Sequence, residues 1–121
     1  METNIKTIFP SADLETRLTE ILCHIGVPTH IKGYQYLRTA ILMAVEDIYI
    51  FDFVTNVLYP AVARSHATTA SIVARAIRNA IKVTWDGGDA DSLNRFFIYN
   101  KNRYKIPTTS VFISSIAAEL R

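Results

Sequence analysis

The chain has 121 residues, of which 50% are hydrophobic and 20% charged, so it can bury one core and is too apolar for a disordered tail. Its formal net charge is +2 and it holds one cysteine, which excludes an intramolecular disulfide and favours a reducing compartment. The sequence has no secretory signal and no apolar run near the roughly 18 residues that span a bilayer. We therefore predict one domain over residues 1–121 that is cytoplasmic and has no membrane partner.

The basic charge is concentrated in the second half of the chain. Residues 1–58 carry four Lys or Arg against seven Asp or Glu, whereas residues 59–105 carry eight against three. No acidic residue occurs from Phe53 through Trp85. A local basic surplus is expected where one surface faces phosphate groups. Charge therefore favours a nucleic acid as the partner.

The first half contains three segments with helical periodicity. A first helix is capped by Ser11 and ends at Gly26, and a second runs from about 33 or 34 to 47. Residues 49–58 form a third apolar helical stretch. Pro60 either kinks that stretch or opens a new helix in its first turn, where proline is tolerated. The sequence leaves both possibilities open.

Residues 59–88 predict two helices joined by a tight turn, the first ending near His66. Thr68 or Thr69 caps the second helix, and Gly87-Gly88 supplies a left-handed stop. At about 100° per residue, one side of the second helix is apolar. That side consists of Val73, Ile77, Ala80, Ile81 and Thr84. The opposite side carries Ser71, Arg75, Arg78, Asn79 and Lys82. The pattern indicates a helix-turn-helix whose second helix binds DNA.

The remaining chain predicts two more helices and a loop. Asp89 or Asp91 caps a short helix, and residues 98–107 form a loop with three basic side chains. Thr108 or Thr109 starts the last helix. Because no alternating strand pattern occurs, we predict an all-α fold of about six helices.

Two strings of the sequence are distinctive: HIGVPTHIKGYQYLRTAI at 24–41 and VLYPAVARSHATTASIVARAIRNAIKVTWDGG at 57–88. They closely resemble the C-terminal effector domain of the sporulation-initiation response regulator of endospore-forming bacteria, the stage zero sporulation protein A family. Residues 107–121 also resemble the end of that domain. The resemblance implies a six-helix domain whose third and fourth helices form a helix-turn-helix that binds short, often tandem promoter boxes. It also implies that members usually carry a phosphorylatable receiver domain in front, which this chain lacks.

The resemblance carries the site over residue by residue. Arg75, Arg78 and Ser71 match the recognition helix of the family. Three neighbouring positions depart, because the family usually has Arg, Glu and His where this chain has Ile72, Ala74 and Asn79. We expected all three to face solvent or DNA. The scaffold is thus predicted to be kept and the DNA-contacting residues to be altered.

The candidate DNA-binding residues are Thr68, Thr69, Ser71, Ile72, Arg75, Arg78, Asn79 and Lys82. Arg75 is the predicted base contact, because arginine can donate two parallel hydrogen bonds to guanine. Asn79 has the chemistry to pair with adenine in the same way, although it lies one turn further along the helix. Arg78 and Lys82 are predicted to contact phosphates, which position a domain without selecting sequence.

A second partner is implied by the resemblance. The sigma-factor contact surface of the family maps to Gly88, Ser92, Asn94 and Phe97, of which Asn94 departs from the family pattern. RNA polymerase sigma factor is therefore a candidate partner. Self-association is expected only on tandem DNA sites, through the last helix, since no long heptad seam is present to hold a dimer.

Other polar residues favour structural roles. Cys23, His24 and His30 are irregularly spaced for a metal site, and we interpret Lys32 and Arg38 as surface or helix-end residues. No carboxylate pair, nucleophile elbow or glycine-rich phosphate loop occurs, so we predict no enzyme activity and no cofactor.

One alternative function stays open. Ile72 and Ala74 add apolar surface where the family has charge. The chain is then a protein-interaction module, a divergent relative that acts on a partner regulator or polymerase without specific DNA binding.

Overall fold

The computed structural model describes residues 10–47, 49–97 and 106–121, and these form helices and connections without a strand. The six α-helices are α2 (Pro10–Ile25), α3 (Lys32–Glu46), α4 (Tyr59–Ser65), α5 (Ala70–Gly87), α6 (Ala90–Phe96) and α7 (Thr109–Leu120). A 3-10 turn, η1 (Ile50–Phe53), and a π-helical turn, η2 (Val54–Leu58), connect α3 to α4. The predicted all-α fold of about six helices is confirmed.

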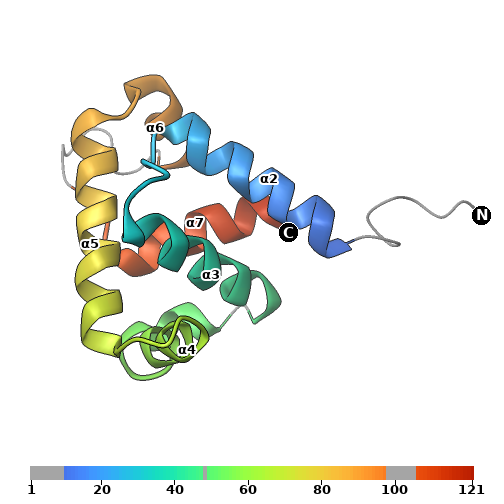
Figure 1. The fold of residues 1–121 in the computed structure, drawn as a ribbon. Coiled ribbons are helices and arrows are strands. Elements are labelled where there is room, and N and C mark those ends of the chain that lie inside the picture. Colours follow the sequence, from blue (N-terminus) through green and yellow to red (C-terminus); the bar gives the residue numbers. More distant parts are fainter. Residues whose placement is uncertain (1–9, 48, 98–105) are drawn as a thin grey trace, which may run out of the picture.

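Helix α5 forms one edge of the molecule (Figure 1). Helix α3 packs against both α5 and α7 and therefore occupies the centre. Figure 1 shows α4 at the N-terminal end of α5 and α6 at its C-terminal end. None of the other described helices covers the outer side of α5. The arrangement packs one side of α5 against the core and leaves the other side, here called the open face, without contact to another described helix.

The helices bury the apolar stripes that periodicity predicts. On α5 the buried residues are Val73, Ile77, Ala80, Ile81 and Thr84. On α7 they are Phe112, Ile113, Ile116, Ala117 and Leu120. The one polar member, Thr84, donates its hydroxyl to the carbonyl oxygen of Ala80 at 2.7 Å, so its burial leaves no hydrogen-bonding group unpaired. The rings of Phe97 and Phe112 stack with centroids 4.9 Å apart and join α6 to α7.

Several helix boundaries differ from the prediction. Helix α2 begins at Pro10, so Ser11 is its second residue and not its cap. Proline starts this helix readily because the first helical N–H has no partner anyway. Residues 50–58 are helical as predicted, but as 3-10 and π turns and not as an α-helix. Pro60 lies in the first turn of α4, but Leu58 and Tyr59 keep right-handed helical backbone angles, so the chain passes from η2 into α4 without a non-helical break.

The predicted left-handed stop after α5 is wrong. Gly87 is the last helical residue, and Gly88 has a φ of −81°, which any residue adopts. A side chain at Gly88 would instead lie 2.5 Å from the carbonyl oxygen of Thr84 and 2.6 Å from that of Ile25. Glycine is therefore needed here because the ends of α5 and α2 meet closely, and not because of backbone conformation. The glycine with positive φ among the described residues is Gly26, at 94°, directly after α2.

Candidate nucleic-acid interface

Helices α4 and α5 are joined by a four-residue turn that closes on itself. The backbone N–H of His66 donates to the carbonyl oxygens of Val62 and Ala63, and the N–H of Thr68 donates to Ala63 at 3.0 Å. Between them Ala67 adopts a left-handed conformation, with φ of 53°. These bonds satisfy the last carbonyls of α4 and turn the chain sharply. The third and fourth α-helices of the described chain thus form a helix-turn-helix.

Thr69 starts the second helix of the pair. It has an extended backbone, and its hydroxyl oxygen accepts a hydrogen bond from the N–H of Ile72 at 3.2 Å. This geometry is that of an N-cap residue. It decides between Thr68 and Thr69, because the N–H of Thr68 belongs to the preceding turn.

The side chain of His66 also anchors the turn to α3, through partners that the sequence did not predict. The Nε2 atom of His66 lies 2.8 Å from the hydroxyl of Thr39, and its ring packs edge-on against Tyr36 with centroids 5.1 Å apart. Both partners belong to α3. The backbone of His66, not its ring, satisfies the end of α4. The ring ties the turn to the central helix, a role visible only once α3 and α4 are placed together.

Helix α3 sets the position of α5 by an unusually close approach at Gly33. A Cβ atom on Gly33 would meet the carbonyl oxygen of Ala76 and would lie 2.6 Å from the Cβ of Ala80. Small residues on both helices allow this contact. It holds the middle of α5 against the core from the side opposite its open face.

The open face of α5 presents six of the eight predicted DNA-binding residues. The exposed side chains are Ser71, Ile72, Arg75, Arg78, Asn79 and Lys82. Of the two threonines of the turn, Thr69 is exposed and Thr68 is half-buried. At about 100° per residue, Arg75 points almost directly away from the buried stripe. The structure therefore brings the predicted residues together on one surface.

Lys82, a predicted phosphate contact, has an acidic partner that the sequence analysis did not name. Its Nζ atom lies 2.8 Å from an Oδ2 atom of Asp86, in an exposed i,i+4 ion pair. Asp86 is the one acidic residue of α5 and was missed, because it follows directly on the acid-free stretch that ends at Trp85. The four-residue spacing between Lys82 and Asp86 could have predicted this ion pair from the sequence.

The family model described as Sporulation initiation factor Spo0A C terminal matches residues 18–120. The chain belongs to this family. Its members are DNA-binding domains of sporulation regulators and not enzymes, so the chain is a DNA-binding transcription regulator in general terms. The resemblance found in the sequence is thereby confirmed.

Two of the three departures from the Spo0A pattern lie on the open face. Ile72 is 50% exposed and Asn79 is exposed. Ala74 is different, because it is half-buried and packs against the core. The expectation that all three face solvent or DNA is therefore wrong for Ala74. A glutamate at this position would compete with core packing.

The residues mapped onto the Spo0A sigma-factor surface are mainly internal. Phe97 is fully buried and Ser92 is 5% exposed, while Gly88 and Asn94 are half-buried. The side chains of Ser92 and Phe97 therefore offer no surface to a partner in this conformation. Contact with polymerase stays a prediction. The exposed Arg95 nearby is better placed for such a contact than the buried Ser92 and Phe97.

Ser92 instead joins two helices. Its hydroxyl donates to the Oδ2 atom of Asp89 at 2.9 Å and lies 3.0 Å from the Nε2 atom of His24 on α2. The backbone N–H of Ser92 donates to the same carboxylate, so Asp89 is the N-cap of α6. The Ser92 N–H and hydroxyl hold the pKa of Asp89 below its ordinary value.

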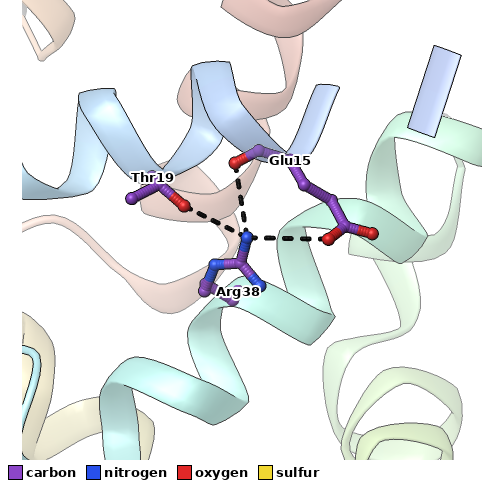
Figure 2. A network of polar contacts seen from close by, with 3 residues as sticks. All are labelled: Glu15, Thr19 and Arg38. Carbon is purple, nitrogen blue, oxygen red and sulfur yellow. Dashed lines mark hydrogen bonds and ion pairs between the residues drawn. The ribbon is translucent and has the colours of Figure 1, made fainter. Parts of the chain in front are cut away.

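Arg38 differs from the predicted surface or helix-end residue, because it lies within α3 and its side chain links α3 to α2. Figure 2 shows its Nη2 atom between three oxygens of α2, with Thr19 Oγ1 at 3.1 Å, the Glu15 carbonyl at 3.3 Å and the Glu15 carboxylate at 4.0 Å. These contacts tie α3 to α2, far from α5. Lys32 is exposed at the start of α3.

The part of the chain that the structure describes holds neither a metal-binding cluster nor a membrane-spanning helix. There, no three His, Cys, Asp or Glu side chains gather closely enough to hold a metal ion. His24 is bonded to Ser92, and Cys23 and His30 are exposed. Across the same residues, no helix has the length and apolar character needed to cross a membrane.

Proposed function

We propose that this protein is a sequence-specific transcription regulator that inserts α5 into the major groove of DNA. The carrying observation is the position of Arg75. It is exposed, points away from the core, and makes no hydrogen bond or ion pair within the described residues. Because no other described helix covers that side of α5 (Figure 1), its open face can enter a groove without displacing one.

Each residue of the open face has a proposed role. Arg75 donates two hydrogen bonds to a guanine, and Asn79, one turn later, pairs with an adenine. Ile72 offers only apolar contact, for which a thymine methyl group is the partner in the major groove. Ser71, Thr68 and Thr69 lie at the N-terminus of α5, where free N–H groups and hydroxyls bind phosphate. Arg78 contacts a phosphate on the flank, and Lys82 does so only where its ion pair with Asp86 opens.

The proposed partners follow from this role. The regulator acts in the cytoplasm, contacts a sigma factor of RNA polymerase near α6, and associates with a second copy on tandem sites. The small outer residues Ser114, Ser115 and Ala118 of α7 are the proposed contact between copies.

The test is a fluorescence-anisotropy titration of duplex DNA at several salt concentrations. A slope of log affinity on log salt of about −4 to −6 is expected, since each neutralised phosphate contributes about −0.9. Arg75→Ala should lose about 1–3 kcal/mol of discrimination at one base pair. Arg95→Ala, an equal charge change at an exposed position of α6, is the matched control and should keep that discrimination.

The alternative function, a protein-interaction module, is favoured by one specific observation. Tyr49, Phe53 and Val57 are 66%, 54% and 44% exposed and follow one another at four-residue spacing before α4. Contiguous exposed apolar surface marks interaction sites, and these three side chains, close in sequence, are candidates for it. Salt-insensitive binding, or no binding at low salt, would favour this alternative over the DNA-binding role.

A further inference from the structure

The only acidic residue of α5, Asp86, lies on the face proposed to meet DNA. Asp86 follows Arg75 by eleven residues, which is three turns and leaves the two side chains about 20° apart around the helix. Lys82 follows Arg75 by seven residues and points about 20° to the other side. The two partners of the ion pair therefore flank the direction in which Arg75 points.

Helix stability does not explain an aspartate at this position. Residue 86 lies in the last turn of α5, which holds no basic residue, and the negative end of the helix dipole disfavours a carboxylate there. The order of the pair, lysine before acid, is also the less favourable one on a helix. Both side chains are well exposed, at 63% for Lys82 and 59% for Asp86, so solvent screens their attraction.

Docking geometry places the pair near the DNA backbone. Recognition helices contact base edges with their N-terminal residues, so with Arg75 at a base the later turns run out towards phosphate. Asp86 lies about 16 Å further along the helix axis than Arg75, beyond the roughly 12 Å width of the major groove. A carboxylate at that point repels phosphate. The same carboxylate also pairs with the ammonium group of Lys82, which would otherwise attract phosphate.

We propose that Asp86 is a positioning residue that holds Lys82 back from the DNA backbone and so lowers the affinity of this protein for DNA of any sequence. This inference rests on the proposed docking of α5. Phosphate contacts do not depend on sequence, so the restraint lowers affinity for operator and non-specific DNA alike.

The experiment measures salt-dependent binding of a random-sequence duplex by anisotropy. Asp86→Asn should bind the random duplex several-fold more tightly at low salt and steepen the log–log salt slope by about one unit, the value of one added phosphate contact. Asp86→Glu, which can still reach Lys82, should behave as the parent. Asp91→Asn removes the same charge from an exposed position of α6 and is the matched control for the change in net charge.

A second variant separates release of Lys82 from removal of a repulsive charge. In a Lys82→Gln background, Asp86→Asn should no longer steepen the slope, because no ammonium group is left to release. If Asp86→Asn changes affinity and slope no more than Asp91→Asn does, the inference fails while the proposed function stands. If Asp86→Asn weakens binding, the carboxylate contacts DNA itself and the inference is again overturned. Failure of the parent to bind any duplex would overturn the proposed function instead.

Discussion

The contact between Gly33 and α5 gives the sharpest test of how the fold positions the DNA-binding face. In Gly33→Ala, the new methyl group meets the carbonyl oxygen of Ala76 and lies 2.6 Å from the Cβ of Ala80. Neither of these atoms can move away by rotating a side chain. The variant must therefore separate α3 from α5 locally.

The magnitude follows from two opposing effects. Overpacking a well-packed site costs about 1–3 kcal/mol, and the upper part of that range applies because backbone must move. Alanine in place of glycine in a helix returns up to about 1 kcal/mol. The free energy of unfolding should therefore fall by about 2 kcal/mol. For a domain of this size the melting temperature should fall by about 6–10 °C.

The assay is thermal and urea unfolding followed by circular dichroism, with Gly87→Ala as the control. Gly87 has ordinary negative φ and open space around its Cβ position, so alanine there should be neutral or slightly stabilising. DNA affinity of folded Gly33→Ala should fall as well, because the helix-turn-helix is displaced. Equal stability of Gly33→Ala and the parent would show that this close approach does not set the position of α5.

Three further outcomes are expected. The double variant Ile72→Arg with Asn79→His, which restores the family residues, should shift DNA sequence preference towards the operator of the family. Its free energy of unfolding should stay within about 0.5 kcal/mol of the parent because both sites are exposed. Selection from a randomised duplex pool measures the preference, and an unchanged preference would contradict the prediction. In sedimentation the protein should be monomeric without DNA, and a stable dimer at low micromolar concentration would contradict this. The pKa of Asp89 is lowered by Ser92, so its charge-dependent stabilisation of the fold is present in full above the ordinary value of 3.8 and is lost as pH falls through the lowered value. The difference in urea midpoint between parent and Asp89→Asn should accordingly shrink below about pH 4, and a constant difference would refute the assignment.

The regular parts of the fold were predictable because they depend on local patterns. The buried stripe of α5 and its polar face follow from a single period, and all five predicted core residues are buried. Three caps were narrowed to two candidates one or two residues apart and no further: Thr69, Asp89 and Thr108 were each one of a pair. Which of two candidates becomes the N-cap depends on the residue at which the backbone leaves the preceding turn. The adjoining helix sets that position.

What the sequence did not predict depends on contacts between distant segments. Gly88 was predicted to end α5 in a left-handed conformation. Glycine is instead needed there because a side chain would meet the carbonyl oxygen of Ile25 on another helix. Phe97 was mapped to a partner surface, although its ring stacks on Phe112 in the core. Ala74 was expected to face solvent or DNA because it is one of the three departures from the family, whereas it is half-buried and packs against the core. In each case the residue type allows two roles, and only the packed partner separates them.

The inner side of α5 packs against the core and its outer side is proposed to contact DNA, so such a domain can change operator without losing its fold. The inner side of the helix is fixed at three points along its length: the Thr69 cap at the start, the Gly33 contact in the middle and the Gly88 contact with α2 at the end. On the outer side, the side chains of Arg75, Ile72 and Asn79 take part in no hydrogen bond or ion pair within the described residues. Substitution there changes the chemistry offered to a base while leaving every fixed point in place. The two exposed departures from the family fall on this unconstrained side, which is where altered sequence preference costs the least stability.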